Sequence, residues 1–166
     1  MKTTSAVLAA AACLAVAVLP ASAAERPSFA ESGERPPVSI ELTPGKGVAI
    51  NKTYGYWEAR SSAEFSVKVT DKGDGDLDEM DAYVFVPAEV EVTGFSGEGW
   101  DCWDVEGGIE CHTGHLVVPG EAWPTLTVRN QVHSHMNEPG AIEVWVTTGR
   151  YGWAGERVPF KTNTST

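Results

Sequence analysis

Residues 99–113, with the sequence GWDCWDVEGGIECHT, contain the features that decide the fold. Cys102 and Cys111 flank a Gly-Gly pair, and glycine supplies the positive φ that tight hairpin turns need. With an even number of residues in the loop, the two cysteines lie opposite each other on paired strands, within reach of a disulfide. The stretch therefore predicts a β-hairpin closed by one disulfide. Two free thiols are the alternative, and a redox-active pair is disfavoured because the sequence has no Cys-x-x-Cys motif.

The third cysteine, Cys13, falls in an N-terminal stretch with the composition of an export signal. A positive start precedes an apolar run over residues 6–19, which is too short to span a bilayer, and residues 21–23, Ala-Ser-Ala, form a small-residue cleavage site. A short buried core helix is the alternative. Cleavage after Ala23 leaves an even number of cysteines in an exported chain, as a disulfide requires. We therefore expect a secreted protein without stable membrane insertion after signal removal.

Short segments of alternating apolar and polar residues follow one another along the rest of the chain. A period of two places each apolar set on one face, as a half-buried antiparallel sheet requires. The segments are separated by turns that contain Gly or Pro, and they lie at residues 38–42, 63–69, 90–93, 100–105, 109–113, 126–129, 142–147 and 158–160. Residues 82–86 form a fully apolar run that Pro87 ends, which gives a ninth segment. Seven to nine strands without an amphipathic helix predict an all-β sandwich or barrel and exclude a parallel α/β fold.

The composition of the chain predicts its domain organisation and disfavours some classes of partner. We expect a signal peptide at 1–23, a flexible or extended Pro-rich lead-in at 24–37, one domain at 38–162 and a tail at 163–166. The 166 residues carry a net charge of −11, which disfavours nucleic acid and anionic membrane surfaces as partners. A hydrophobic content of 42% with six tryptophans excludes global disorder.

A resemblance covers residues 66–132, about half of the exported part. Its pieces are Val67-Lys68-Val69, Val84-Phe85-Val86-Pro87, Gly99-Trp100-Asp101-Cys102 with Cys111, Pro119-Gly120 and Leu126-Thr127-Val128. In this order they resemble the conserved-repeat, immunoglobulin-like (Ig-like) domains of unknown function from exported bacterial surface proteins. The resemblance implies an Ig-like antiparallel β-sandwich without established catalytic residues, and the Ala-rich signal is similar to those of actinobacteria. The single copy and the acidic turn at 71–81 depart from the family pattern.

Three tryptophans are the candidate binding residues. Trp103 falls on the hairpin face opposite the cysteines, and Trp145 alternates out of phase with its apolar neighbours, so both are expected to face outward. Trp57 lies in a glycine-punctuated stretch with two tyrosines. Exposed rigid aromatics commonly grip a sugar ring or a protein partner. If the three line one surface, the protein is a binding module. The alternative is that they cover a sheet edge or form a second small cluster.

Acidic residues give a calcium hypothesis. Asp74, Asp76 and Asp78 stand at alternate positions, like the first ligands of a calcium loop, because hard cations take clustered carboxylates. The EF-hand pattern fails, since Glu79 stands where that loop needs glycine and Phe85 where it needs glutamate. A calcium site of another kind and a solvated acidic turn both remain open. No other cofactor is expected.

Catalytic patterns are weak in this sequence. Four histidines could bind zinc or copper if their segments meet, namely His112, His115, His133 and His135. The sequence has no G-x-S-x-G motif and no H-E-x-x-H motif. We therefore expect a non-enzymatic, secreted or envelope Ig-like module with a structural or recognition role and a protein or glycan surface partner. The alternatives are a carbohydrate- or small-ligand-binding module that uses exposed tryptophans and a metal-dependent enzyme.

Overall fold

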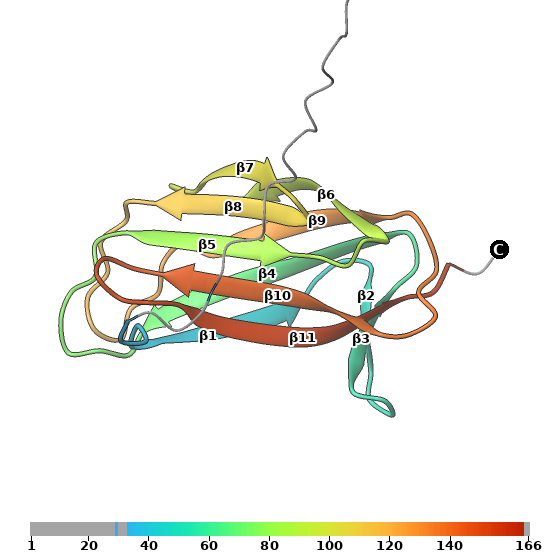
Figure 1. Cartoon of the computed structure of the whole chain (residues 1–166), viewed down its shortest axis with the longest axis horizontal. Coiled ribbons are helices and arrows are strands. Elements are labelled where there is room, and N and C mark those ends of the chain that lie inside the picture. The colour runs from blue at the N-terminus through green and yellow to red at the C-terminus, as the bar shows by residue number, and fades with distance from the viewer. Residues whose placement is uncertain (1–28, 30–32, 165–166) are drawn as a thin grey trace, which may run out of the picture.

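Eleven strands in two sheets make up the part of the chain that the computed structural model describes, residue 29 and residues 33–164 (Figure 1). The predicted signal peptide with its predicted cleavage site, and most of the predicted lead-in, lie outside these residues. The strands are β1 Val38–Pro44, β2 Val48–Asn51, β3 Tyr56–Ala59, β4 Ser62–Asp71, β5 Met80–Phe85, β6 Val90–Ser96, β7 Asp101–Val105, β8 Gly108–Thr113, β9 Leu126–Val132, β10 Gly140–Thr147 and β11 Ala154–Thr162. The described residues include no helix long and apolar enough to cross a membrane.

The two sheets form the predicted Ig-like β-sandwich. One sheet has four strands in the order β1-β4-β9-β6, and the other has seven in the order β2-β3-β11-β10-β5-β8-β7. All of the strand pairs within these sheets are antiparallel except one, because β3 runs parallel to β11. The predicted antiparallel β-sandwich is therefore confirmed, with eleven strands in place of the expected seven to nine and with one parallel pair.

The additional strands are β2 and β3, which form a hairpin that projects from the body of the sandwich (Figure 1). Each has only four residues, so a face carries two side chains at most, too few for a period of two to stand out. Ile50 on β2 is 54% exposed, so this strand also lacks the buried apolar side chains from which a strand is predicted. The nine segments predicted from the sequence pattern correspond to β1 and to β4–β11.

Alternating side chains of the two sheets meet in the core. On β4, Phe65, Val67 and Val69 are buried, and on β10, Val144 and Val146 are buried in the same cluster. Full burial of a side chain of this kind contributes roughly 1.5–3 kcal/mol to folding. The remaining side chains of β5, β8 and β10 point to the outer face of the seven-stranded sheet, where the candidate site lies.

The disulfide is confirmed. Cys102 on β7 and Cys111 on β8 are direct cross-strand partners with a Cα–Cα distance of 4.0 Å. Cys111 is fully buried, and Trp100 at the base of the hairpin lies in the same core cluster, as the alternation predicts. The bond thus fixes the edge strand β7 onto β8.

Reduction of this disulfide is expected to lower the melting temperature by several degrees. Nine positions of sequence separate the cysteines. Closing a loop of that size lowers the conformational entropy of the unfolded chain and so stabilises the folded state by roughly 2.7 kcal/mol. Thermal unfolding followed by circular dichroism, with and without reductant, measures the shift. An unchanged melting temperature, or two free thiols in the purified secreted protein, would contradict this expectation.

The described part of the lead-in is held against the sandwich. The Glu34 carbonyl accepts a hydrogen bond of 2.8 Å from the Gly152 amide, and the Pro37 carbonyl accepts one of 2.7 Å from the Lys72 amide. Phe29 contacts three aromatic rings on the seven-stranded sheet and the ring of Trp153, the residue before β11. These described residues of the lead-in therefore have defined partners on the sandwich.

Candidate functional site

A row of side chains crosses the outer face of the seven-stranded sheet. Trp145 on β10 pairs with Tyr83 on β5, Tyr83 pairs with Glu110 on β8, and Glu110 pairs with Trp103 on β7. Direct cross-strand partners point to the same face with Cβ atoms about 5 Å apart. These four residues, which we call the aromatic row, therefore form one continuous strip. In Figure 1 their strands follow one another as β10, β5, β8 and β7.

The row continues onto β11 through a glycine. Gly155 is the cross-strand partner of Trp145. A Cβ atom at this position would lie 2.6 Å from the Trp145 ring, closer than side chains allow. The Trp145 indole therefore lies over the backbone of β11, a position that is open only because residue 155 has no side chain.

Phe29 from the lead-in covers one end of the row. Its ring stacks on Trp145 at a centroid distance of 4.9 Å with an interplanar angle of 1°. It meets Trp153 edge-on at 5.0 Å, Tyr83 at 5.6 Å and Phe85 at 5.8 Å. We call Tyr83, Phe85, Trp145 and Trp153 the Phe29 seat. These are the offset and edge-to-face geometries that aromatic pairs prefer.

Hydrogen bonds set the polar character of the row. Trp103 Nε1 donates to Glu110 Oε2 at 3.1 Å. Burial raises the pKa of the Tyr83 phenol well above its usual value, and the hydrogen bond and charge of Glu110, with the charge of Asp81, raise it further. The phenol therefore stays protonated and donates to the Glu110 carboxylate, so two aromatic donors hold this one acceptor in place.

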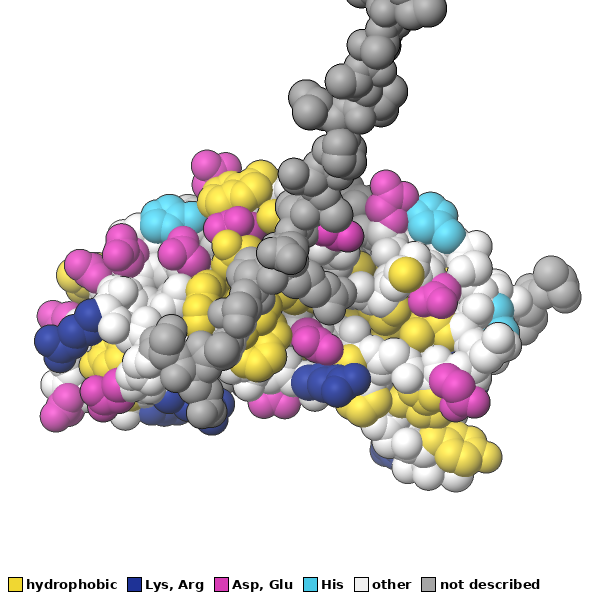
Figure 2. Space-filling view, viewed as in Figure 1, with side chains coloured by type: hydrophobic (Ala, Val, Ile, Leu, Met, Phe, Trp, Pro, Cys, Tyr) yellow, Lys and Arg dark blue, Asp and Glu magenta, His cyan; other side chains and the backbone are white. Residues whose placement is uncertain are grey.

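Carboxylates surround the aromatic rings. Asp81 stands two residues before Tyr83 on β5, and Glu143 is the cross-strand partner of Phe85. Asp81 Oδ1 lies 2.8 Å from His112 Nδ1, and Glu143 Oε1 lies 3.8 Å from Nε of Arg157. Figure 2 shows hydrophobic side chains at the middle of this face and acidic ones around them. The surface thus combines stacking rings with a negative rim.

The outward orientation of two of the three candidate tryptophans agrees with the alternation. Trp103 is 44% exposed, and Trp145 is half-buried beneath Phe29. Trp57 is not part of this surface, because it is 7% exposed and packs in the core with its ring centroid 6.4 Å from that of Phe65. The three candidate tryptophans therefore do not line one surface, since β3 turns the Trp57 side chain toward the four-stranded sheet.

The sequence pattern does not single out four rings of the site, those of Phe29, Tyr83, Phe85 and Trp153. Trp153 lies between the segments predicted at 142–147 and 158–160. Tyr83 and Phe85 belong to the apolar run at 82–86, which suggests a strand buried on both faces without showing what covers the second face. Phe29 lies in a polar stretch without periodicity. The only signal for the seat is that this strand needs a cover on its outer side.

The candidate metal-binding residues lie outside the aromatic row. Asp74, Asp76 and Asp78 are exposed, and calcium binding by their turn stays a prediction. His112 bonds to Asp81 in one sheet, whereas His133 Nε2 lies 2.7 Å from Glu91 Oε2 beside the other. Within residues 29 and 33–164, no three His, Cys, Asp or Glu side chains lie close enough together to hold a metal ion.

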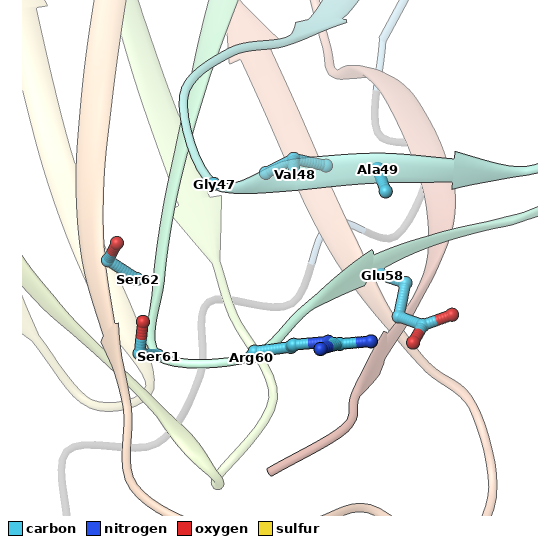
Figure 3. A pocket seen from close by; sticks show the side chains of 7 residues that line it. All are labelled: Gly47, Val48, Ala49, Glu58, Arg60, Ser61 and Ser62. Atoms are coloured by element: carbon cyan, nitrogen blue, oxygen red, sulfur yellow. The ribbon is translucent and has the colours of Figure 1, made fainter. Parts of the chain in front are cut away.

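An open hollow of about 540 Å³ lies beside the β2–β3 hairpin (Figure 3). Its lining residues are Gly47, Val48, Ala49, Glu58, Arg60, Ser61 and Ser62. Glu58 already accepts a hydrogen bond of 2.9 Å from the Asn163 side chain, and Figure 3 shows Arg60 extending toward Glu58. Ligand pockets are usually lined by apolar and aromatic side chains, and this lining has no aromatic one. The outer face is therefore the stronger candidate.

Comparisons with known proteins place the fold. No family model and no curated protein matches the chain. BcpA, the major pilin subunit of Bacillus cereus, is similar at a TM-score of 0.55 and 7% identity, over 76% of this chain and 40% of BcpA. The major pilin SpaD from Corynebacterium diphtheriae matches at a TM-score of 0.45 and 10% identity, over 76% of this chain and 34% of SpaD. The chain spans about two fifths of the length of BcpA. Such low identity shows a shared fold alone.

Proposed function

We propose that this protein is an extracellular, non-catalytic recognition module whose contact surface is the outer face of the seven-stranded sheet. The aromatic row carries the proposal, because rigid rings beside fixed hydrogen-bonding groups are the common means of recognising partners. The disulfide is consistent with an oxidising compartment outside the cytoplasm. The likeness to pilin subunits supports a role in contact rather than in chemistry.

A carbohydrate-binding module is the second candidate function. Trp103 favours it, because its 44% exposed ring lies beside the Glu110 carboxylate. A sugar ring can stack on such an indole while its hydroxyls bond to the carboxylate. The position of Trp103 at the edge strand β7 leaves this ring outside the cover that Phe29 provides.

Loss of the row is expected to abolish partner binding. Labelled protein is applied to an array of glycans and extracellular peptides, and Trp103→Ala with Trp145→Ala is expected to lower every signal above background at least tenfold. Tyr54→Ala is the matched control, because Tyr54 is 75% exposed on the distant β2–β3 hairpin. Equal signals for the row variant and the wild type, or equal losses in the row variant and the control, would refute the proposal.

A further inference from the structure

The Phe29 seat has the form of a receptor for one aromatic side chain. A stacked partner, Trp145, and the edge-on ring of Trp153 lie at 4.9 and 5.0 Å from the Phe29 ring. Phe85 is only 2% exposed although it points away from the core between the sheets. The seat therefore encloses an inserted ring deeply enough to exclude water from its floor.

The occupant of the seat is a side chain of a peptide segment that also makes a backbone contact. Five residues after Phe29, the Glu34 carbonyl accepts a hydrogen bond of 2.8 Å from the Gly152 amide. Gly152 directly precedes Trp153, which belongs to the seat. The surface thus offers a ring socket and, beside it, a backbone donor, and this combination suits an extended peptide better than a sugar.

The charges around the seat define the preferred sequence of such a peptide. Asp81, Glu110 and Glu143 belong to the rim, and Arg157 on β11 is the cross-strand partner of Glu143. A cation next to the inserted ring would meet a carboxylate, whereas an acidic segment would be repelled. The lead-in itself has Arg26 three residues before Phe29.

We propose that the Phe29 seat binds an aromatic side chain, flanked by Lys or Arg, on an extended segment of a partner protein, and that Phe29 occupies the seat in the free protein. This inference rests on the proposed recognition function and names its ligand class. Binding of the partner requires that Phe29 leaves the seat. A short tether keeps Phe29 at an effective concentration of about millimolar, so a partner segment must compete with it.

The test opens the seat with Phe29→Ala in the full chain and titrates in a synthetic peptide of residues 25–35, ERPSFAESGER. Tryptophan fluorescence is expected to change saturably, with an affinity at least tenfold higher for Phe29→Ala than for the wild type. The same peptide with Phe29→Ala is expected to bind at least tenfold more weakly. A peptide with Glu31→Lys and Glu34→Lys is expected to bind more tightly at low salt.

Further variants separate a failure of this inference from a failure of the proposed function. Adding Trp153→Ala to the opened protein is expected to abolish peptide binding, whereas adding Tyr54→Ala is expected to preserve it, and circular dichroism verifies that each variant is folded. Equal binding of the peptides with and without the phenyl ring would overturn the inference. So would binding of neutral chito- or cello-oligosaccharides in place of the peptide, although recognition by this face would then stand. Array signals that do not depend on Trp103 and Trp145 would refute the function itself.

Discussion

Replacing Trp57 with alanine is expected to lower the free energy of unfolding by about 3–5 kcal/mol, the usual cost of deleting a large buried aromatic side chain. Trp57 is 7% exposed, and its ring contacts that of the fully buried Phe65 at a centroid distance of 6.4 Å. On β3 it pairs with Ile50 of β2 and with Phe160 of β11. A cavity here would loosen the junction at which the projecting hairpin joins the seven-stranded sheet.

The matched control is Trp103→Ala, which removes the same side chain from an exposed position. It is expected to change the free energy of unfolding by less than about 1 kcal/mol, because Trp103 is 44% exposed and makes one exposed hydrogen bond. Urea unfolding followed by far-ultraviolet circular dichroism measures both variants. Similar losses of unfolding free energy in the two variants would contradict the prediction that the buried Trp57 contributes more to stability than the exposed Trp103.

The contrast between these two tryptophans shows how far alternation predicts the fold. Trp103 stands in a hairpin whose register is fixed by Cys102 and Cys111, so the face of each residue follows by counting. Trp57 lies on a strand of four residues that joins the sheet through a parallel pairing with β11. That pairing links residues about a hundred positions apart, and no local pattern encodes it.

The candidate site was predictable to a similar, partial extent. The outward direction of Trp145 follows from its phase relative to Val144 and Val146, and the structure agrees. The Phe29 seat and its occupant could not be predicted, because the seat combines β5, β10 and the residue before β11, and the occupant comes from a distant lead-in. Contacts of that kind depend on tertiary packing, whereas sequence periodicity reports only which face of its own strand a side chain occupies.

The Gly107-Gly108 pair shows a second limit of the sequence pattern. Both glycines suggest a turn, but only Gly107 has a positive φ, at 80°. Gly108 begins β8 and pairs with Phe85 on one side and Val105 on the other. A Cβ atom on Gly108 would lie 1.9 Å from the Val84 carbonyl oxygen, so this glycine is required by a close approach of backbones.

Gly108→Ala is therefore expected to lower the free energy of unfolding by about 3 kcal/mol or more. The obstructing atoms belong to the backbone of β5, so no side-chain rotation relieves the clash, and the strands must separate.

Gly114→Ala is the control, because no heavy atom beyond its two neighbours in the chain lies within 4 Å of a Cβ atom at that position and its φ is not positive. Urea unfolding compares the two, and equal stability would contradict the close approach. Since β5 and β8 also carry Tyr83 and Glu110, a separation of these strands would break the aromatic row. Gly108→Ala should then lose partner binding even under conditions in which it remains folded.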